Sequence, residues 1–320
     1  MNTRILGWTD LQLTTVGFGA WAIGGGDWKF GWGPQDDEES IRTIRRALDL
    51  GINWIDTAAV YGYGHSEEVV GRAIQGLRQR PWIATKCSRI QGPDGAPFGR
   101  LKRDSILAEL EASLRRLGVD AIDLYQIHWP QPDEDIEEGW GAIADAVKAG
   151  KVRYAGVCNF GVGHLQRIQK IHPVASLQPP YSMLVRGVEA ELLPFCGENR
   201  IGVVVYSPMQ KGLLTGAFTR ERVQKLPAND HRRNDPRFNE PQFSRILTLV
   251  DQLRPIAERN GMSLAQMAIA WVLRRPEVTS AIVGARHPSQ VDETARAGDL
   301  ALSPDDIERI DQLLAERRLG

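Results

Sequence analysis

The sequence has few cysteines, no long apolar run and no recognisable targeting segment. Its three cysteines, Cys87, Cys158 and Cys196, are scattered, and none belongs to a CxxC pair. We therefore expect free thiols rather than a disulfide framework or a zinc site. No apolar run approaches the ~20 residues that cross a bilayer, and the N-terminus lacks a signal-peptide core. These absences favour a cytoplasmic protein with no membrane partner.

The sequence also has no excess of positive or negative charge. The 320 residues include 39 Lys and Arg against 40 Asp and Glu, which gives a formal net charge of −1. Nucleic-acid binding normally needs a basic surplus or a basic stripe, so we expect no nucleic-acid partner. Hydrophobic residues make up 42% of the chain and charged residues 25%, which is typical of a globular protein with a sizeable core.

The chain does contain a regular alternation of two patterns. Amphipathic segments with helical spacing, such as 36–51 and 103–118, separate short apolar runs. These runs are continuously apolar, as in parallel strands buried on both faces. We predict an α/β fold, a (β/α)8 TIM barrel, as one domain over 1–320. There are eight such runs, at 14–21, 52–58, 81–86, 122–129, 154–160, 175–180, 202–208 and 279–285.

Three segments fall outside the repeat. A short apolar piece before the first strand predicts an N-terminal β-hairpin at the bottom of the barrel. Residues 302–317 predict an extra C-terminal helix, with acids in its first turn. Residues 219–244 are polar and carry three prolines. Loops of this length are usually functional or disordered, and this one follows the seventh strand, so we place it on the barrel's active face.

The stretch GFGAWA at 17–22 matches the dinucleotide fingerprint G-x-G-x-x-G/A. That fingerprint works only where a helix begins, because the helix N-terminus meets the pyrophosphate. The residues that follow are rich in Gly and Trp and have no helical periodicity. We therefore expect other residues to hold the phosphates of any dinucleotide.

Polar or aromatic side chains end nearly every predicted strand. A single one of them is more often a helix cap or a loop anchor than a functional group. As a set, they meet at the C-terminal face of the barrel, where this fold carries its chemistry. In chain order they are Trp21, Asp56, Lys86, His128, Asn159, Gln178, Tyr206 and Gly284.

Four residues predict a site that polarises a carbonyl group and donates a proton. The ammonium group of Lys86 favours the phenolate of Tyr61, and we expect it to lower that pKa from its usual ~10. Asp56 is placed to keep Lys86 charged. His128 could donate a hydrogen bond to a carbonyl oxygen. Because no side chain supplies a hydride, the site implies a nicotinamide cofactor.

Further strand ends suit that cofactor. Asn159 and Gln178 offer amides for a carboxamide, and Tyr206 offers a flat face for the nicotinamide ring. The loop at 207–216 could hold a pyrophosphate. Arg286 precedes a short helix and suits a 2′-phosphate, which favours NADP over NAD. The alternative for Arg286 is a solvated surface arginine.

Tryptophan side chains are expected near these loops. Trp21, Trp28, Trp32 and Trp129 could wall an apolar substrate pocket, or they could pack the loops together. The sequence leaves both interpretations open.

Several motifs in this order resemble the aldo-keto reductase superfamily, over essentially the whole chain. They are DTAAVYGYGHSEEVVG at 56–71, IATK, DLYQIHWP, GVCNF, QPPYSML, YSPMQKGLLTG and IVGARHPSQVDE. The pattern looks most like a bacterial branch near the general stress reductases and the potassium-channel β-subunits. The resemblance implies an Asp–Tyr–Lys–His tetrad at Asp56, Tyr61, Lys86 and His128, with Tyr61 as the general acid.

The resemblance also implies a set of cofactor contacts. The family's Ser-Asn pair appears here as Cys158-Asn159. Gln290 stands where relatives often have Arg, and Thr294 where they have Asn, so the grip on a 2′-phosphate would rest more on Arg286. The implied contacts are Ala20, Trp21, Asp56, Cys158, Asn159, Gln178, Tyr206, Ser207, Pro208, Gln210, Lys211, Gly212, Leu213, Gly284, Arg286, Gln290, Glu293 and Thr294.

We therefore predict an NADP(H)-dependent reductase of small aldehydes or ketones, with NADH as the less favoured cofactor, acting as a monomer or homo-oligomer. Trp21, Trp28 and Trp129 are the predicted substrate pocket. The alternative is a cofactor-sensing, largely non-catalytic regulatory subunit of the channel β-subunit type. A metal-dependent barrel hydrolase would need more ligands than Asp56 and His128, so we expect no metal.

Overall fold

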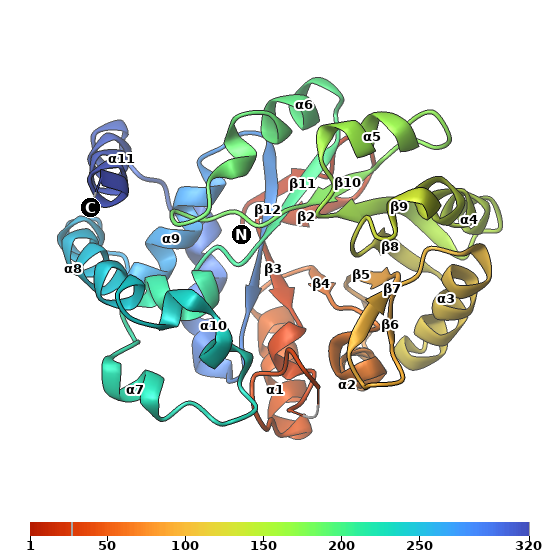
Figure 1. Cartoon of the computed structure of the whole chain (residues 1–320), viewed down its shortest axis with the longest axis horizontal. Coiled ribbons are helices and arrows are strands. Elements are labelled where there is room, and N and C mark those ends of the chain that lie inside the picture. Colours follow the sequence, from red (N-terminus) through yellow and green to blue (C-terminus); the bar gives the residue numbers. More distant parts are fainter. Residues whose placement is uncertain (27, 320) are drawn as a thin grey trace.

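Eight parallel strands close into a barrel in the computed structural model, which describes residues 1–26 and 28–319 (Figure 1). Each strand pairs with the next along the chain, and β12 closes the ring by pairing with β3, where Ala281 lies opposite Val16. The predicted (β/α)8 barrel is confirmed. Its strands are β3 (Val16–Gly19), β4 (Trp54–Asp56), β5 (Trp82–Cys87), β8 (Ile122–Ile127), β9 (Val152–Cys158), β10 (Ser176–Gln178), β11 (Gly202–Tyr206) and β12 (Val278–Gly284).

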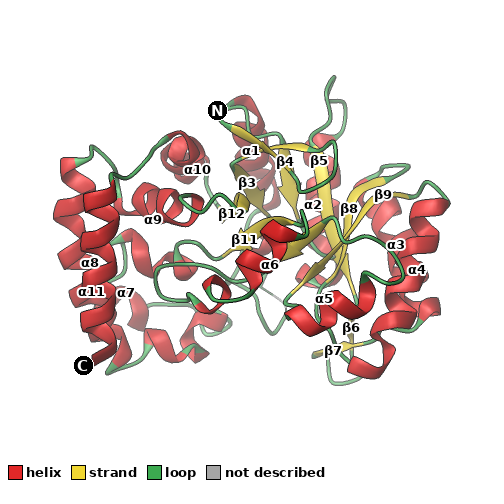
Figure 2. Cartoon of the chain, turned by 90° about the horizontal axis from the view of Figure 1, so that it is seen from above, coloured by secondary structure: helices red, strands yellow, loops and turns green. Residues whose placement is uncertain are grey.

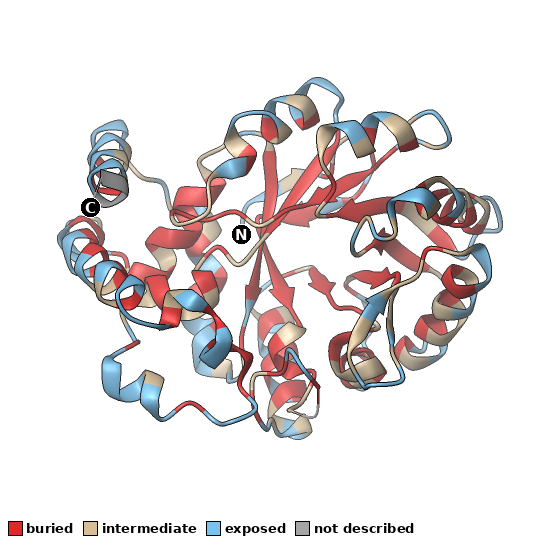
Figure 3. Cartoon of the chain, in the orientation of Figure 1, coloured by how far each residue is buried: buried red, intermediate tan, exposed pale blue. Residues whose placement is uncertain are grey.

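Helices surround the barrel and bury one face against it (Figure 3). The sequence marks their ends clearly. The side chain of Asp36 accepts a hydrogen bond from the backbone N–H of Glu39 at the start of α1, and Gly118 ends α3 in the left-handed conformation, with φ 67°. The surrounding helices are α1 (Asp37–Asp49), α2 (His65–Ile74), α3 (Arg103–Leu117), α4 (Ile136–Lys148), α5 (Val162–Ile168), α6 (Leu192–Glu198), α9 (Leu264–Leu273) and α10 (Pro288–Thr294).

The N-terminal hairpin closes the bottom of the barrel, as predicted. Its strands β1 (Thr3–Ile5) and β2 (Gln12–Thr14) are antiparallel. Leu6 and Leu11, in the turn between the strands, are fully buried. They pack with Trp54 and Leu124, which belong to the barrel strands. The lower half of the barrel interior is therefore apolar and filled.

Two parts of the chain are more regular than the sequence indicated. A hairpin of β6 (Arg89–Gln91) and β7 (Pro97–Gly99) follows β5. The segment at 219–244 contains α7 (Arg220–Gln224), the 3-10 turns η6 (His231–Asn234) and η7 (Pro236–Phe238), and the start of α8 (Gln242–Arg259). We did not predict α8. It contains Pro255, and an internal proline usually indicates the end of a helix.

The predicted C-terminal helix is confirmed as α11 (Pro304–Leu319). It lies against α8 on the outside of the barrel (Figure 2). Asp306 at its start accepts hydrogen bonds from Arg259 and Asn260 at the end of α8. Among the helices of residues 1–26 and 28–319, none is both long and apolar enough to cross a membrane.

Candidate active site

The upper half of the barrel interior is polar, in contrast to the lower half. Lys86 is the centre of this polar layer and is fully buried. Its Nζ lies 2.6 Å from Asp56 Oδ1, 2.8 Å from the carbonyl oxygen of Thr57 and 3.3 Å from the hydroxyl of Tyr61. Burial alone would lower the pKa of Lys86, but the Asp56 carboxylate, with smaller contributions from Tyr61 and Cys158, outweighs burial, and the pKa of Lys86 is raised. Lys86 is therefore an ammonium group held against a phenol.

Tyr61 begins a tight turn, η2 (Tyr61–Gly64), that follows β4. Gly62 and Gly64 have φ values of 62° and 107°, which favour glycine. A Cβ on Gly62 would lie 2.0 Å from the carbonyl oxygen of Gly24, so no side chain fits there. Burial raises the pKa of Tyr61 to about 12, although Lys86 acts to lower it. The predicted lowering of this pKa is wrong, because desolvation of the phenolate outweighs the attraction of Lys86.

An ion pair between α2 and α3 supports this turn. The carboxylate of Glu67, in α2, accepts hydrogen bonds from Thr85 at 2.5 Å and from Arg116 Nε at 2.7 Å. A Cβ on Gly64 would lie 2.8 Å from Cδ of Arg116. Because Thr85 is the neighbour of Lys86, the contact joins the strand of Lys86 to the turn of Tyr61.

His128 directly follows β8, and its ring meets the ring of Tyr61 edge to face at 5.8 Å between centroids. Burial, with smaller contributions from Lys86 and Arg89, lowers the pKa of His128 well below its ordinary value. The imidazole is therefore neutral near pH 7 and can donate one hydrogen bond. The structure thus brings together all four predicted residues Asp56, Tyr61, Lys86 and His128.

The predicted amide and aromatic groups lie beside this cluster. Gln178 Nε2 donates to Asp56 Oδ2 at 2.8 Å. Asn159 Nδ2 donates to the carbonyl oxygen of His128 at 3.0 Å, and the hydroxyl of Tyr206 donates to Asn159 Oδ1 at 2.9 Å. These side chains form one connected layer across the mouth of the barrel.

Gln126 is a buried polar residue that sequence reasoning missed. It lies in β8 and has no exposed surface. Its Oε1 accepts from Cys158 Sγ at 3.7 Å and from Ser176 Oγ at 3.4 Å. The signal was present: Gln126 stands two residues before His128, and alternate residues of a strand share a face. A polar residue between Leu124 and His128 on that face indicates a polar barrel interior.

The loop after β11 has an unusual backbone. Ser207, Gln210 and Lys211 have φ values of 56°, 48° and 56°, and Gly212 has φ 95°. Pro208 and Leu213 are buried beneath this loop. Gln210 Nε2 donates to Ser182 Oγ at 3.0 Å. Strained backbone of this kind collects at functional sites; phosphate binding by this loop stays a prediction.

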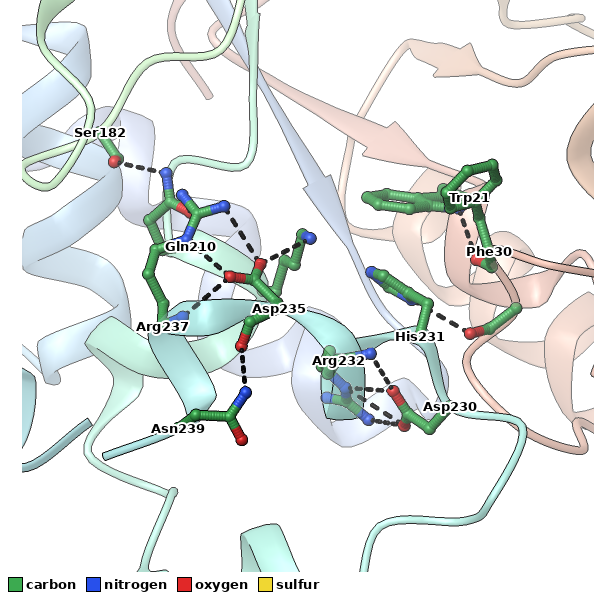
Figure 4. A network of polar contacts seen from close by, with 12 residues as sticks. Trp21, Phe30, Ser182, Gln210, Asp230, His231, Arg232, Asp235, Arg237 and Asn239 are labelled. Atoms are coloured by element: carbon green, nitrogen blue, oxygen red, sulfur yellow. Dashed lines mark hydrogen bonds and ion pairs between the residues drawn. The ribbon is translucent and has the colours of Figure 1, made fainter. Parts of the chain in front are cut away.

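The segment at 219–244 connects this loop with the loop after β3 (Figure 4). Asp235 accepts from Lys211 Nζ at 2.9 Å and from Arg237 Nε at 3.0 Å. At the other end, the backbone N–H and Nδ1 of His231 both lie 3.0 Å from the carbonyl oxygen of Gly31. The segment therefore crosses the active face, as predicted, but the sequence did not indicate its ion pairs.

The side chain of Arg286 is hydrogen-bonded to a neighbouring loop. Its guanidinium group donates to Gln35 Oε1 at 2.6 Å, to the carbonyl oxygen of Trp32 at 3.1 Å and to that of Pro34. It is therefore not the solvated surface arginine of the alternative interpretation. All three partners are neutral oxygen atoms, which leave the positive charge of Arg286 in place.

The residues after Arg286 belong mostly to the first turns of α10. Gln290 Oε1 accepts from the backbone N–H of Arg286 at 2.7 Å and from that of the N-cap residue His287 at 3.3 Å, and the latter contact caps the helix. Thr294 donates to the carbonyl oxygen of Gln290 at 2.8 Å, whereas Glu293 is exposed. Gly284 ends β12 and is also exposed. Gly284, Gln290 and Glu293 are therefore exposed, whereas Thr294 is buried.

The aromatic side chains divide into two groups. Trp21 stacks on Tyr61 at 6.3 Å and Trp28 lies 5.9 Å from it, between ring centroids. Ala20 donates its backbone N–H to the carbonyl oxygen of Asp56 at 2.8 Å, which holds the start of this loop on the tetrad. Trp129 is 39% exposed and lies at the rim. Trp21 and Trp28 therefore fit the predicted pocket more closely than Trp129 does.

A nicotinamide dinucleotide fits these residues. Arg286 and Lys211, the latter paired with Asp235, are the cationic groups that would meet its phosphates, and the ring of Tyr206 is half-buried beside the tetrad. Metal ligands do not gather in the same way: across the described residues, no group of three or more His, Cys, Asp or Glu side chains could hold a metal ion.

Comparison with known proteins identifies the family of the chain. The model of the family described as Aldo/keto reductase family matches residues 15–315. The chain is 38% identical to the aldo-keto reductase YhdN of Bacillus subtilis, over 96% of this chain and 91% of that protein. It is 36% identical to the NADH-specific methylglyoxal reductase of Escherichia coli, over 94% of each.

A solved structure extends the likeness to three dimensions. The glycerol dehydrogenase AKR11B4 from Gluconobacter oxydans superposes with a TM-score of 0.89 at 37% identity, covering 99% of this chain and 96% of that one. Sequence, fold and relatives agree, and the chain belongs to the aldo/keto reductase family of oxidoreductases.

Proposed function

We propose that this protein reduces small aldehydes or ketones to alcohols with NADPH, and that Tyr61 is the general acid. The observation that carries the proposal is the contact of Lys86 Nζ with both Asp56 and the hydroxyl of Tyr61, at 2.6 and 3.3 Å. It places a charged ammonium beside a phenol at the mouth of a barrel, where this fold carries its active sites.

Each residue has a role in the proposed reaction. A bound nicotinamide supplies the hydride that side chains cannot provide. His128, neutral because burial lowers its pKa, donates a hydrogen bond that orients the carbonyl oxygen. Tyr61 gives its proton to that oxygen.

Lys86 acts on the state that follows proton transfer. The phenolate of Tyr61 is then buried 3.3 Å from Lys86 Nζ, and the ammonium compensates much of the cost of burying this negative charge. Asp56 keeps Lys86 charged and in place. Because burial raises the pKa of Tyr61 to about 12, the phenol is fully protonated, and so ready to donate, throughout the neutral pH range.

The preference for NADPH is supported by charge at the rim. Arg286 keeps its positive charge among neutral oxygen atoms, whereas the nearby Arg232 is paired with Asp230. The guanidinium fork of Arg286 suits a 2′-phosphate. A relative of 36% identity is named NADH-specific, so both cofactors belong in the test.

The test is oxidation of NADPH and of NADH, followed by absorbance, with a panel of carbonyl compounds that includes activated aromatic aldehydes, methylglyoxal and dihydroxyacetone. We expect carbonyl-dependent oxidation with a higher kcat/KM for NADPH. Tight cofactor binding without turnover on any carbonyl would contradict the proposal and favour the regulatory-subunit alternative.

A further inference from the structure

The side chain of Gln126 occupies a place where an apolar residue would be expected. It is fully buried inside the barrel. Leu124, two residues earlier on the same face of β8, is apolar and packs with the residues that fill the bottom of the barrel. Its Nε2 has no hydrogen-bond partner among the described residues. A buried amide with an unpaired donor is unfavourable compared with an apolar side chain of the same size. A residue that merely filled this space would therefore not be glutamine.

Neighbouring residues leave room for this amide. Gly156 lies opposite Gln126 in the pairing of β8 with β9. A Cβ on Gly156 would lie 2.2 Å from Ser176 Oγ and 3.1 Å from Gln126 Cγ. The space of a missing side chain is therefore taken by two polar groups that contact one another.

The contacts of Gln126 lead to Gln178. The amide nitrogen of Gln178 donates to Asp56 Oδ2 at 2.8 Å, and the same nitrogen lies 3.5 Å from Gln126 Oε1. An amide nitrogen has two hydrogens, and two oxygen atoms lie within reach of this one. A flipped amide would place the oxygen of Gln178 against these two acceptors. The carbonyl oxygen of Gln178 is thus directed away from both, as an acceptor.

We propose that Gln126 is a positioning residue that, together with Asp56, fixes the orientation of the Gln178 amide. Gln178 then presents an oxygen to an N–H donor of the ligand, which in a nicotinamide is its carboxamide. This inference rests on the proposed function, because it presumes a nicotinamide cofactor. Gln126 does not touch the ligand; it acts through Gln178.

Binding of whole and truncated ligands tests this role. NADP⁺ carries the carboxamide, whereas 2′,5′-ADP has the same adenosine phosphates without the nicotinamide. Q126M keeps the volume and removes the acceptor, so we expect NADP⁺ binding to weaken about tenfold, as for loss of one hydrogen bond, and 2′,5′-ADP binding to stay within about twofold. Q178M should show the same selective loss, and isothermal titration calorimetry measures both Kd values.

The matched control is Ser280→Ala. Ser280 is equally buried inside the barrel, but its hydroxyl donates to the carbonyl oxygen of Thr14, near the bottom. S280A should leave the ratio of the two Kd values unchanged. If Q126M does not fold, Q126N, which withdraws the oxygen by one methylene, takes its place with the same expectation.

The outcomes separate the two proposals. Equal weakening of both ligands, or of neither, in a folded Gln126 variant would overturn the positioning role. Failure of the wild-type protein to bind either NADP⁺ or NAD⁺ would instead contradict the proposed function itself.

Discussion

Two clusters of ion pairs lie at the active face, and they are built in opposite ways. Asp56 and Lys86 come from different strands, and their side chains are 4% and 0% exposed. Asp235 pairs with Arg237, two residues away and 36% exposed, and with Lys211. Water screens charges at the rim and hardly reaches those in the interior. The same kind of ion pair therefore joins two barrel strands at one place and two surface loops at the other.

The largest expected effect comes from breaking the interior pair. D56N keeps the shape of the side chain but leaves the ammonium of Lys86 buried without a carboxylate. We expect the free energy of unfolding to fall by about 3–5 kcal/mol, measured by urea denaturation, and turnover to be lost with it.

The matched control for D56N is an exposed pair. Glu221 and Lys225 are 74% and 72% exposed, and E221Q should change the free energy of unfolding by less than about 0.5 kcal/mol. Similar losses in D56N and E221Q would remove the distinction between the interior and the rim.

Protonation of His231 should have a smaller effect on the free energy of unfolding. This side chain is 8% exposed and lies in the segment at 219–244. Burial, and next Lys211, lower the pKa of His231 to about 4, below the ~6.5 of an unfolded chain. Between these values the unfolded chain binds more protons, so stability is present above pH ~6.5 and is lost as the pH falls toward 4. After allowance for solvent, this amounts to about 2 kcal/mol.

The variant H231N tests that pH dependence. An Asn amide can still donate to the carbonyl oxygen of Gly31 but does not titrate. We expect its free energy of unfolding to fall less steeply between pH 7 and 4 than that of the wild type, with the part due to His128 remaining. Parallel curves for the two proteins would show that His231 does not contribute.

The smallest effect is expected at the rim cluster. D235N removes the charge shared by Lys211 and Arg237, but Arg237, at 36% exposed, can turn toward water, and the amide of Asn can still accept a hydrogen bond from Lys211. We expect a loss of about 1 kcal/mol and faster proteolytic cleavage within 219–244. A loss as large as that of D56N would mean that the rim pair is as poorly screened as the interior pair.

The comparison also explains what the sequence could predict. Asp56, Lys86 and His128 end strands of a regular repeat, so their convergence follows from the fold. Asp235 and His231 lie in irregular chain, where only tertiary contacts show what they meet. The net pKa of Tyr61 could not be read from its neighbour Lys86 alone, because it depends on how completely the fold excludes water. Likewise, Pro255 made the sequence of α8 look unlike one continuous helix. The helix continues past this proline because its apolar side chains are buried in the core.

The most direct test of the central claim compares Tyr61 with Tyr63 in the same turn. The hydroxyl of Tyr63 donates to the carbonyl oxygen of Gly95 at 2.6 Å, outside the tetrad. We predict that Y61F lowers kcat for carbonyl reduction by a factor of about 100 or more, with the Kd for NADP⁺ nearly unchanged, and that Y63F retains turnover. Turnover of Y61F equal to that of Y63F and the wild type would contradict the assignment of Tyr61 as the proton donor.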